Sequence, residues 1–207
     1  MKQLNLKKIE QMLKVIDPSE KRKIQKNIIE SMSDFKIEKV LGDNNAVLMY
    51  SDLAKYQSID QVLPTDKSFK IILIRETENS GHWVALLRYT LNNQTIVELF
   101  NSYGLFPSDD LKFMSNSQNI QLGQDSKHLN RLLETALKLG YNVIYNKYDF
   151  QKYSDSVHTY NTCGRWASIR VLLMLQYSFS LNDFIQYIKS LKAKYKIGFD
   201  EIVSLLI

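Results

Sequence analysis

The feature that most constrains this chain is a long apolar stretch that begins at its only cysteine. Cys163 opens a run that continues through Trp166 to Leu175 and is typical of a long apolar helix. A helix N-terminus gathers unpaired backbone N–H groups and a partial positive charge, and both favour a thiolate over a thiol. Cys163 is therefore a candidate nucleophile. A buried, inert cysteine on the inner face of the helix would give the same pattern.

The first 41 residues have the pattern of basic helices. Apolar residues recur at helical spacing between Leu4 and Ile16. A second helix start follows, with Asp17 as N-cap, Pro18 in the first turn and Glu20 closing a capping box. The second helix carries a cluster of four cations, Lys21, Arg22, Lys23 and Lys26. These cations fit a solvated helix face, and they also fit a contact surface for nucleic acid or an acidic partner.

Strand-like runs occupy the middle of the chain, at residues 69–74, 83–89 and 95–100. The last two are separated by Leu91-Asn92-Asn93-Gln94, which predicts a hairpin turn and therefore antiparallel neighbours. Residues 141–145 indicate one more strand.

Further helices are expected after the hairpin. Asp125 is expected to cap a helix that ends at Gly140. After the helix that begins at Cys163 come a helix capped by Ser180 and a last apolar segment at 199–207. Helices, then a small sheet, then helices predict an α+β domain.

The composition predicts one domain. The 207 residues are 44% hydrophobic, which is enough for one substantial core. With 7 Gly and 3 Pro the chain has no Gly/Pro-rich linker, so we expect a single domain over 1–207 with 1–41 as a helical N-terminal extension. No apolar run reaches the ~18 residues of a membrane span, and the N-terminus lacks the apolar core of a signal peptide. A lone cysteine excludes an internal disulfide and fits a reducing compartment.

A nucleophile needs a base and a group that orients the base. His82 begins one strand, and Asn101 ends the next strand, 19 residues later. In a hairpin the start of one strand faces the end of its partner, so the two side chains can meet. An Asn oxygen can accept the imidazole N–H and fix its tautomer. Glu98 is the rival carboxylate, but strand alternation directs it to the face opposite Asn101.

The other two histidines are weaker candidates. His128 falls in the helix expected after Asp125 and is expected at the surface. His158 lies five residues before Cys163 and stays open as a rival base. The sequence has no Cys-x-x-Cys pair, no His-Glu-x-x-His and no Gly-rich phosphate loop, so we expect no metal and no cofactor.

The order of these residues and their neighbours resembles a protease family. The matching segments are Gly81-His82-Trp83, Phe100-Asn101-Ser102-Tyr103-Gly104 and Thr162-Cys163-Gly164-Arg165-Trp166, with a glutamine before the last. They are similar to the adenovirus protease and to the proteases that process SUMO and related modifiers. The last segment and Arg170 look most like capsid-maturation proteases of virophages, giant viruses and Maverick-type elements. The resemblance covers residues 68–178, the expected catalytic core. It implies the adenovirus-protease-like (papain-like) fold, a small mixed sheet packed against a central helix that starts at the nucleophile.

The resemblance also implies roles for the site residues. Cys163 is the nucleophile, His82 the general base and Asn101 its orienting partner. The family uses a carboxylate at the position of Asn101, so this chain should stabilise the imidazolium less. A glutamine upstream of the nucleophile helps to form the oxyanion hole in this family, and Gln151 is the candidate. Gln151 precedes Cys163 by 12 residues, a longer gap than is usual, so residues 152–161 should bulge outward.

Two residues are expected to bind the substrate. Trp83 resembles the tryptophan that narrows the cleft of SUMO proteases around a glycine pair, and a core aromatic would also explain it. Gly164 is expected to contact the substrate next to the nucleophile. Trp166 is expected to pack in the core.

The function implied by the resemblance is that of a monomeric cysteine endopeptidase. It would cleave viral capsid or scaffold precursors at glycine-containing sites, in the virion or the host cytoplasm, without a membrane. A protease that removes ubiquitin-like or SUMO-like modifiers is the alternative, and an inactive homologue that only binds peptides is a third.

The resemblance raises the question of activation. Adenovirus protease is activated by DNA and by a short peptide joined to it through a disulfide. Here such a disulfide would consume Cys163, so a peptide activator must bind non-covalently. DNA is the other possible activator, because residues 1–41 hold ten Lys or Arg against six Asp or Glu, a net charge of +4 within a total of +5.

We predict that the full chain binds DNA and that its affinity falls steeply between low and physiological salt, because such binding releases counterions. Changing Lys21, Arg22, Lys23 and Lys26 together to Glu should remove most of this affinity. Binding measured at two salt concentrations tests both statements. If the charge reversal leaves the affinity unchanged, the segment is only a solvated structural cap.

Overall fold

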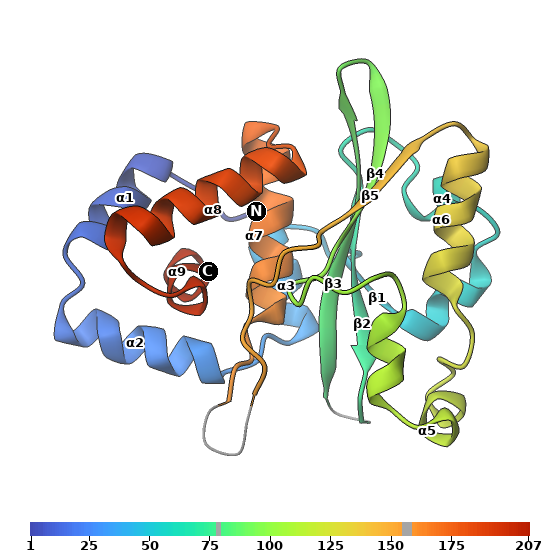
Figure 1. The fold of residues 1–207 in the computed structure, drawn as a ribbon, viewed down its shortest axis with the longest axis horizontal. Coiled ribbons are helices and arrows are strands. Elements are labelled where there is room, and N and C mark those ends of the chain that lie inside the picture. Colours follow the sequence, from blue (N-terminus) through green and yellow to red (C-terminus); the bar gives the residue numbers. More distant parts are fainter. Residues whose placement is uncertain (78–79, 155–158) are drawn as a thin grey trace.

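The computed structural model describes residues 1–77, 80–154 and 159–207, and a five-stranded mixed sheet lies at its centre (Figure 1). The strands are adjacent in their chain order, which is β1 (Val47–Met49), β2 (Phe69–Arg75), β3 (Gly81–Leu91), β4 (Gln94–Phe100) and β5 (Asn142–Tyr145). Strand β3 is antiparallel to both neighbours, whereas β1 and β5 run parallel to β2 and β4. The expected small mixed sheet is confirmed.

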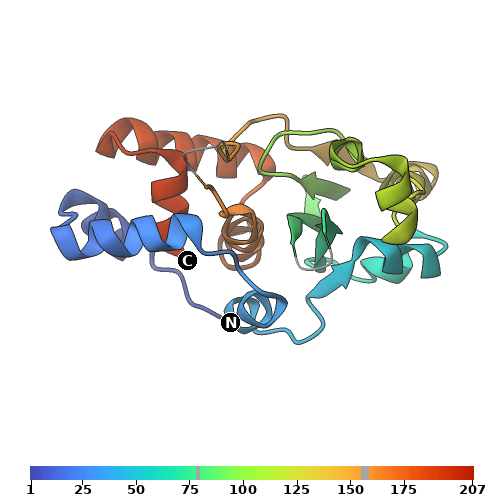
Figure 2. The ribbon, with the colours of Figure 1, turned by 90° about the horizontal axis from the view of Figure 1, so that it is seen from below.

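Helix α7 (Cys163–Tyr177) packs on one face of this sheet. Figure 2 shows it nearly end-on, between the sheet and helices from the two chain ends. The helices on this side are α1 (Leu6–Lys14), α2 (Pro18–Ile29), α3 (Asp34–Leu41), α8 (Leu181–Tyr195) and α9 (Phe199–Leu206). The central helix that begins at Cys163 is therefore confirmed.

The other face of the sheet is covered by the 3₁₀ helix η1 (Tyr50–Lys55), α4 (Ile59–Val62) and α6 (His128–Lys138). The 3₁₀ helix η2 (Asp109–Phe113) and α5 (Asn116–Gln121) lie in the connection between β4 and α6. Successive side chains of a strand point to opposite faces. Val84 and Leu86 accordingly join the core under α6, while Ala85 and Leu87 join the core under α7.

Helix α7 is buried along most of its length, from Cys163 to Met174. Trp166 is fully buried, as expected. Arg170 is a charged side chain within this buried stretch. Its guanidinium lies against the sheet beside the carboxylate of Glu98. Its Nε donates to Glu98 Oε1 (2.7 Å) and its Nη2 to Oε2 (2.6 Å), and the hydroxyl of Tyr89 also donates to Oε2 (2.8 Å). Every polar end of this cluster is thus hydrogen-bonded.

Several local predictions are confirmed. Asn92 and Asn93 both have positive φ, 49° and 61°, and join β3 to β4 in a two-residue turn, as the antiparallel hairpin requires. The capping box of Asp17 and Glu20 is present at the start of α2.

The expected helix cap at Asp125 is wrong. Helix α6 starts three residues later, at His128, and its N-cap is Lys127. The carbonyl of Ser126 accepts hydrogen bonds from the hydroxyl of Tyr50 and from the N–H of His128. Because this tight turn packs against η1, helix α6 starts later in the chain than predicted.

Strand β1 and helices η1 and α4 were not predicted, because three to six residues are too few for a periodic pattern. In the part of the chain that the structure describes, no helix is both long and apolar enough to cross a membrane.

We predict that Glu98→Gln lowers the free energy of unfolding by about 3–5 kcal/mol. The substitution leaves the buried guanidinium of Arg170 without its countercharge, which is more costly than losing an exposed pair. Urea unfolding of the purified variant measures this loss.

Asp60→Asn is the matched control, because Asp60 also pairs with an arginine, Arg88, but its side chain is 41% exposed. Its loss should be about 1 kcal/mol or less. Equal losses in the two variants would show that burial of the Glu98 pair has no energetic weight.

Candidate active site

His82 and Asn101 meet at the end of the sheet nearest the start of α7. His82 is the second residue of β3, and Asn101 directly follows β4. The Nε2 atom of His82 lies 2.9 Å from Oδ1 of Asn101, and both residues are buried. The contact expected from the hairpin is confirmed.

Cys163 is the first residue of α7 and is hydrogen-bonded to His82. Since Nε2 of the imidazole is held by Asn101, the nitrogen that serves the thiol is Nδ1. Burial raises the pKa of Cys163. The hydrogen bond and the charge of His82 outweigh burial, with help from the backbone of Trp83 and Gly164, and hold the pKa below its usual range.

The interaction between Cys163 and His82 shifts the pKa of His82 in the opposite direction. Burial lowers the pKa of His82, but the hydrogen bond and charge of Cys163, the charge of Asp110 and the bond to Asn101 raise it to about 9. The two shifts describe a thiolate beside an imidazolium, the reactive form of a cysteine nucleophile.

The start of α7 adds backbone donors near the thiolate. The first helical hydrogen bond runs from the N–H of Trp166 to the carbonyl of Thr162 (2.9 Å). The N–H groups of Cys163, Gly164 and Arg165 precede that ladder and form the positive end of the helix dipole.

A contact missed from the sequence lies behind Asn101. The Nδ2 atom of Asn101 donates to both oxygens of Asp110, at 3.1 and 2.9 Å, and Asp110 is itself buried in η2. Asp110 Oδ1 lies 3.9 Å from His82 Nε2. No local pattern marks Asp110 in the sequence, because it follows β4 in a loop. Glu98 is excluded as the partner of His82, since it binds Arg170 on the other face, as expected.

An aromatic lid on His82 was also missed. The ring of Tyr103 stacks on the imidazole with centroids 4.4 Å apart, and Tyr153 stacks on Tyr103 at 4.3 Å. The N–H of Tyr103 donates to Asn101 Oδ1 (3.0 Å). Tyr103 therefore both covers the imidazole and helps to hold its partner.

Gln151 is buried next to these residues, and its amide is already hydrogen-bonded. Its Oε1 accepts from the hydroxyl of Ser102 (2.8 Å), and its Nε2 donates to Tyr103 Oη (3.2 Å) and to the carbonyl of Tyr160 (3.1 Å). An oxyanion would have to replace one of these two acceptors.

The two remaining histidines are His128 and His158. His128 is half-buried, with its ring 5.8 Å from that of Tyr50, so the expected surface position is only partly correct. His158, the rival base, lies outside the described residues. Nowhere in the described ranges do three or more His, Cys, Asp or Glu side chains form a group that could hold a metal.

Two sets of hydrogen bonds hold the chain on either side of Cys163. Asp200 at the start of α9 accepts hydrogen bonds from the hydroxyl of Thr162 (2.6 Å) and the N–H of Lys152 (3.2 Å). At the end of α2, the carbonyl of Ile28 accepts from the N–H of Asn161 (2.7 Å), and that of Glu30 accepts from Arg165 (2.5 Å). Helices from both chain ends thus position Cys163.

A groove of about 650 Å³ lies beside this site. Its wall includes Trp83, Met32, Glu76, Gly81 and Asn161, and Asn161 is two residues before the nucleophile. The indole N–H of Trp83 donates to the carbonyl of Met32 (3.1 Å), which holds the ring in the wall.

Gly164 lets α7 approach this wall closely. A Cβ atom at Gly164 would lie 2.9 Å from Cβ of Met32 and 3.2 Å from Cδ1 of Trp83, so a larger residue would push them apart. The contact of Gly164 with a substrate stays a prediction.

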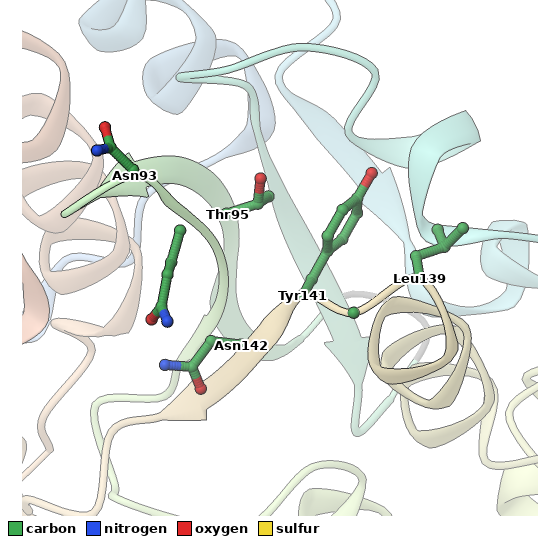
Figure 3. A pocket seen from close by; sticks show the side chains of 7 residues that line it. Asn93, Thr95, Leu139, Tyr141 and Asn142 are labelled. Carbon is green, nitrogen blue, oxygen red and sulfur yellow. The ribbon is translucent and has the colours of Figure 1, made fainter.

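A second pocket, of about 470 Å³, lies at the hairpin end of the sheet (Figure 3). Asn93 and Thr95 bound it on one side, and Leu139, Tyr141 and Asn142 on the other. The hairpin and His82 are at opposite ends of β3, roughly 30 Å apart along the strand. This pocket is therefore remote from Cys163.

The sequence is similar to that of a virophage protein. It is 31% identical over 176 residues to "Uncharacterized protein V9" of Sputnik virophage, across 85% of this chain and 93% of that protein. The chain belongs to the family of this virophage protein. No family model matches it.

Two solved structures match this chain at low sequence identity. A crystal structure of the ASFV pS273R protease matches with a TM-score of 0.50 and 15% identity, over 87% of this chain and 69% of that one. A second crystal structure of this protease gives a TM-score of 0.38 and 17% identity, over 67% of this chain and 42% of that one. The chain therefore spans less than half of that second structure. The first match shows the fold, and the expected adenovirus-protease-like fold class is confirmed.

We predict that the alkylation rate of Cys163 by iodoacetamide is nearly constant between neutral pH and about pH 9. The charge and hydrogen bond of His82 favour the thiolate for as long as the imidazole keeps its proton, and the pKa of His82 is raised to about 9, whereas a free cysteine, with a pKa near 8.5, would react faster with each step in pH. Mass spectrometry can follow the reaction without ambiguity, because the chain has no other cysteine.

His82→Ala is the informative variant. Without the imidazolium, burial raises the thiol pKa, so alkylation at pH 7 should slow by about tenfold or more and should rise steadily with pH. A wild-type rate that already rises tenfold per unit between pH 6 and 8 would contradict the ion pair.

Proposed function

We propose that this protein is a cysteine endopeptidase with Cys163 as nucleophile, His82 as general base and acid, and Asn101 as the partner that orients His82. The observation that carries the proposal is the buried chain of contacts from Cys163 through His82 to Asn101 at a helix N-terminus. The fold shared with a viral protease supports it.

The expected reaction has two steps, acylation and deacylation, and both Cys163 and His82 act in each. The Cys163 thiolate attacks the peptide carbonyl, and the His82 imidazolium gives its proton to the leaving amine. An acyl-enzyme remains on sulfur. The neutral imidazole then takes a proton from water as the water oxygen attacks the acyl carbon. The second tetrahedral intermediate collapses to the acid product and the Cys163 thiolate, which restores the thiolate–imidazolium pair.

The oxyanion of each tetrahedral intermediate needs donors. The backbone N–H of Cys163 is one, at the positive end of α7. We assign the second to Nε2 of Gln151, which would exchange its bond to the Tyr160 carbonyl for one to the oxyanion. Ser102 holds the oxygen end of the same amide and so keeps the nitrogen end directed toward the site.

The substrate we propose is a chain with glycine at the cleavage site. Support comes from the close packing of Gly164 against Met32 and Trp83, which narrows the approach to Cys163 beside the groove. In this proposal Trp83 lies over the backbone of the substrate, where a side chain larger than hydrogen would collide with the ring.

The biological substrate we propose is a viral capsid or scaffold precursor, cleaved in the virion or in the host cytoplasm. The virophage origin of the relative supports a viral setting. A DNA or non-covalent peptide activator would bind near the exposed cations of α2, Lys21, Arg22, Lys23 and Lys26.

We expect Cys163→Ala and His82→Ala each to reduce peptide cleavage by at least about 10³-fold while the chain remains folded. The double variant should be no worse than either single variant, because the two side chains act as one unit. Cleavage of a capsid-precursor peptide library, read by mass spectrometry, measures these losses and maps the cleaved bond.

Two further variants separate the supporting roles. Asn101→Ala should cost less than His82→Ala, because it misorients the base without deleting it. Gln151→Ala should lower kcat by roughly 10²-fold with little change in KM, as loss of an oxyanion donor does.

Cleavage of modifier-fused substrates alone would favour the alternative, a protease for ubiquitin-like modifiers. Full activity of His82→Ala would refute the assignment of the base.

A further inference from the structure

Asn101 is held at both ends of its amide by groups of opposite hydrogen-bonding character. Its Oδ1 accepts from His82 Nε2 (2.9 Å) and from the N–H of Tyr103 (3.0 Å). Its Nδ2 donates to the two oxygens of Asp110 (2.9 and 3.1 Å). A flipped amide would face two donors with its NH₂ group and a carboxylate with its oxygen. The contacts therefore fix one orientation of the amide.

That orientation determines which nitrogen of His82 serves the thiol. With an acceptor fixed at Nε2, the proton stays on Nε2, and Nδ1 is left to exchange a proton with Cys163. Asp110 reaches the catalytic pair only through Asn101, since its nearest oxygen is 3.9 Å from Nε2.

The buried carboxylate of Asp110 has a nearby countercharge. The carboxylate of Asp110 is 4% exposed, and a buried charge is costly unless a countercharge lies near it. The neighbouring Asp109 is paired with Lys112, at 2.7 Å, so that lysine is occupied elsewhere. The imidazolium of His82 is the cation that faces Asp110.

We propose that Asp110 is a positioning residue of the active site, which locks the Asn101 amide with its oxygen toward His82 and supplies the negative charge that a neutral Asn101 lacks. This inference rests on the proposed cysteine protease function. The four residues then form one line, Cys163, His82, Asn101 and Asp110, across α7, β3, the end of β4 and η2.

Several titratable groups share this environment and must be considered in any pH profile. They are Cys163 on α7, Tyr103 after β4, Asp109 beside Asp110, Tyr50 on η1 and Tyr153 over Tyr103. Burial raises the pKa of Asp110, and the charge of His82 and the bond from Asn101 oppose that rise. Protonation of Asp110 would remove the charge that stabilises the imidazolium.

The test compares variants that keep or exchange the charge. Asp110→Asn keeps a hydrogen-bonding oxygen for Asn101 but removes the charge, and Asp109→Asn is the matched control on the adjacent residue. The pKa of His82 is read from the titration of its ring protons by NMR, which is practical with three histidines. We expect Asp110→Asn to lower this pKa by about one unit, a tenfold change in the equilibrium constant for protonation of His82, and Asp109→Asn to leave it nearly unchanged.

An exchange of the two side chains gives a second and sharper test. In the double variant Asn101→Asp/Asp110→Asn, one carboxylate and one amide remain in reversed order, and the carboxylate contacts His82 directly. This variant should recover the His82 pKa that Asp110→Asn alone lowers, because one negative charge again faces the imidazolium. A merely structural Asp110 would not predict this recovery.

The outcomes separate the two proposals. If Asp110→Asn leaves the His82 pKa unchanged, or if the double variant does not recover it, the role of Asp110 is refuted. If Asp110→Asn does not fold, the double variant decides the matter, because a His82 pKa well below that of the wild type would then refute the role of the charge. The histidine titration gives its answer whether or not a peptide is cleaved, so a failed protease assay with a shifted His82 pKa would refute only the protease function.

Discussion

The buried pair of Arg170 and Glu98 is the interaction on which the site geometry depends. Apolar packing holds α7 against the sheet but is not directional, so it leaves the helix free to slide and rotate. The guanidinium fork removes that freedom. Arg170 is two turns after Cys163, about 10 Å along α7, and Asn101 is three residues after Glu98, also about 10 Å along β4. Because α7 and β4 run in opposite directions at this contact, Cys163 arrives level with Asn101 and His82.

The N-terminal helices hold the chain on the other side of Cys163. The carbonyl of Met32 accepts from the Trp83 indole, and those of Ile28 and Glu30 accept from Asn161 and Arg165 around Cys163. Residues 1–41 looked like an extension in the sequence, yet their contacts belong to the site. The cations of α2 are exposed, so they remain available to an acidic partner while the end of the same helix supports Cys163.

Sequence reasoning succeeded where a signal was local. Asn92 and Asn93 predicted the turn, the turn fixed the pairing of β3 with β4, and this pairing brought His82 to Asn101. Cys163 at the start of an apolar run predicted its place on α7. Asp110 and the cap at Lys127 were out of reach, because each depends on contacts between residues distant in the chain or on a loop whose path no periodic pattern encodes. The hydrogen-bond partners of Gln151 could not be predicted for the same reason, since Tyr103 and Tyr160 reach its amide from separate segments of the chain.

Asp110 also alters one physical expectation about Asn101. From the sequence, a neutral residue where the adenovirus and SUMO proteases that it resembles have a carboxylate should leave the imidazolium poorly stabilised. The structure places a carboxylate one step further away, 3.9 Å from His82 Nε2. At an effective dielectric constant of 20, two charges at this distance attract by about 4 kcal/mol, roughly three quarters of the value for a direct contact. Most of the electrostatic support is therefore retained. A carboxyl group can take up a proton and become a donor, whereas the amide oxygen of Asn101 only accepts, so it holds the proton on Nε2 while Nδ1 faces the thiol.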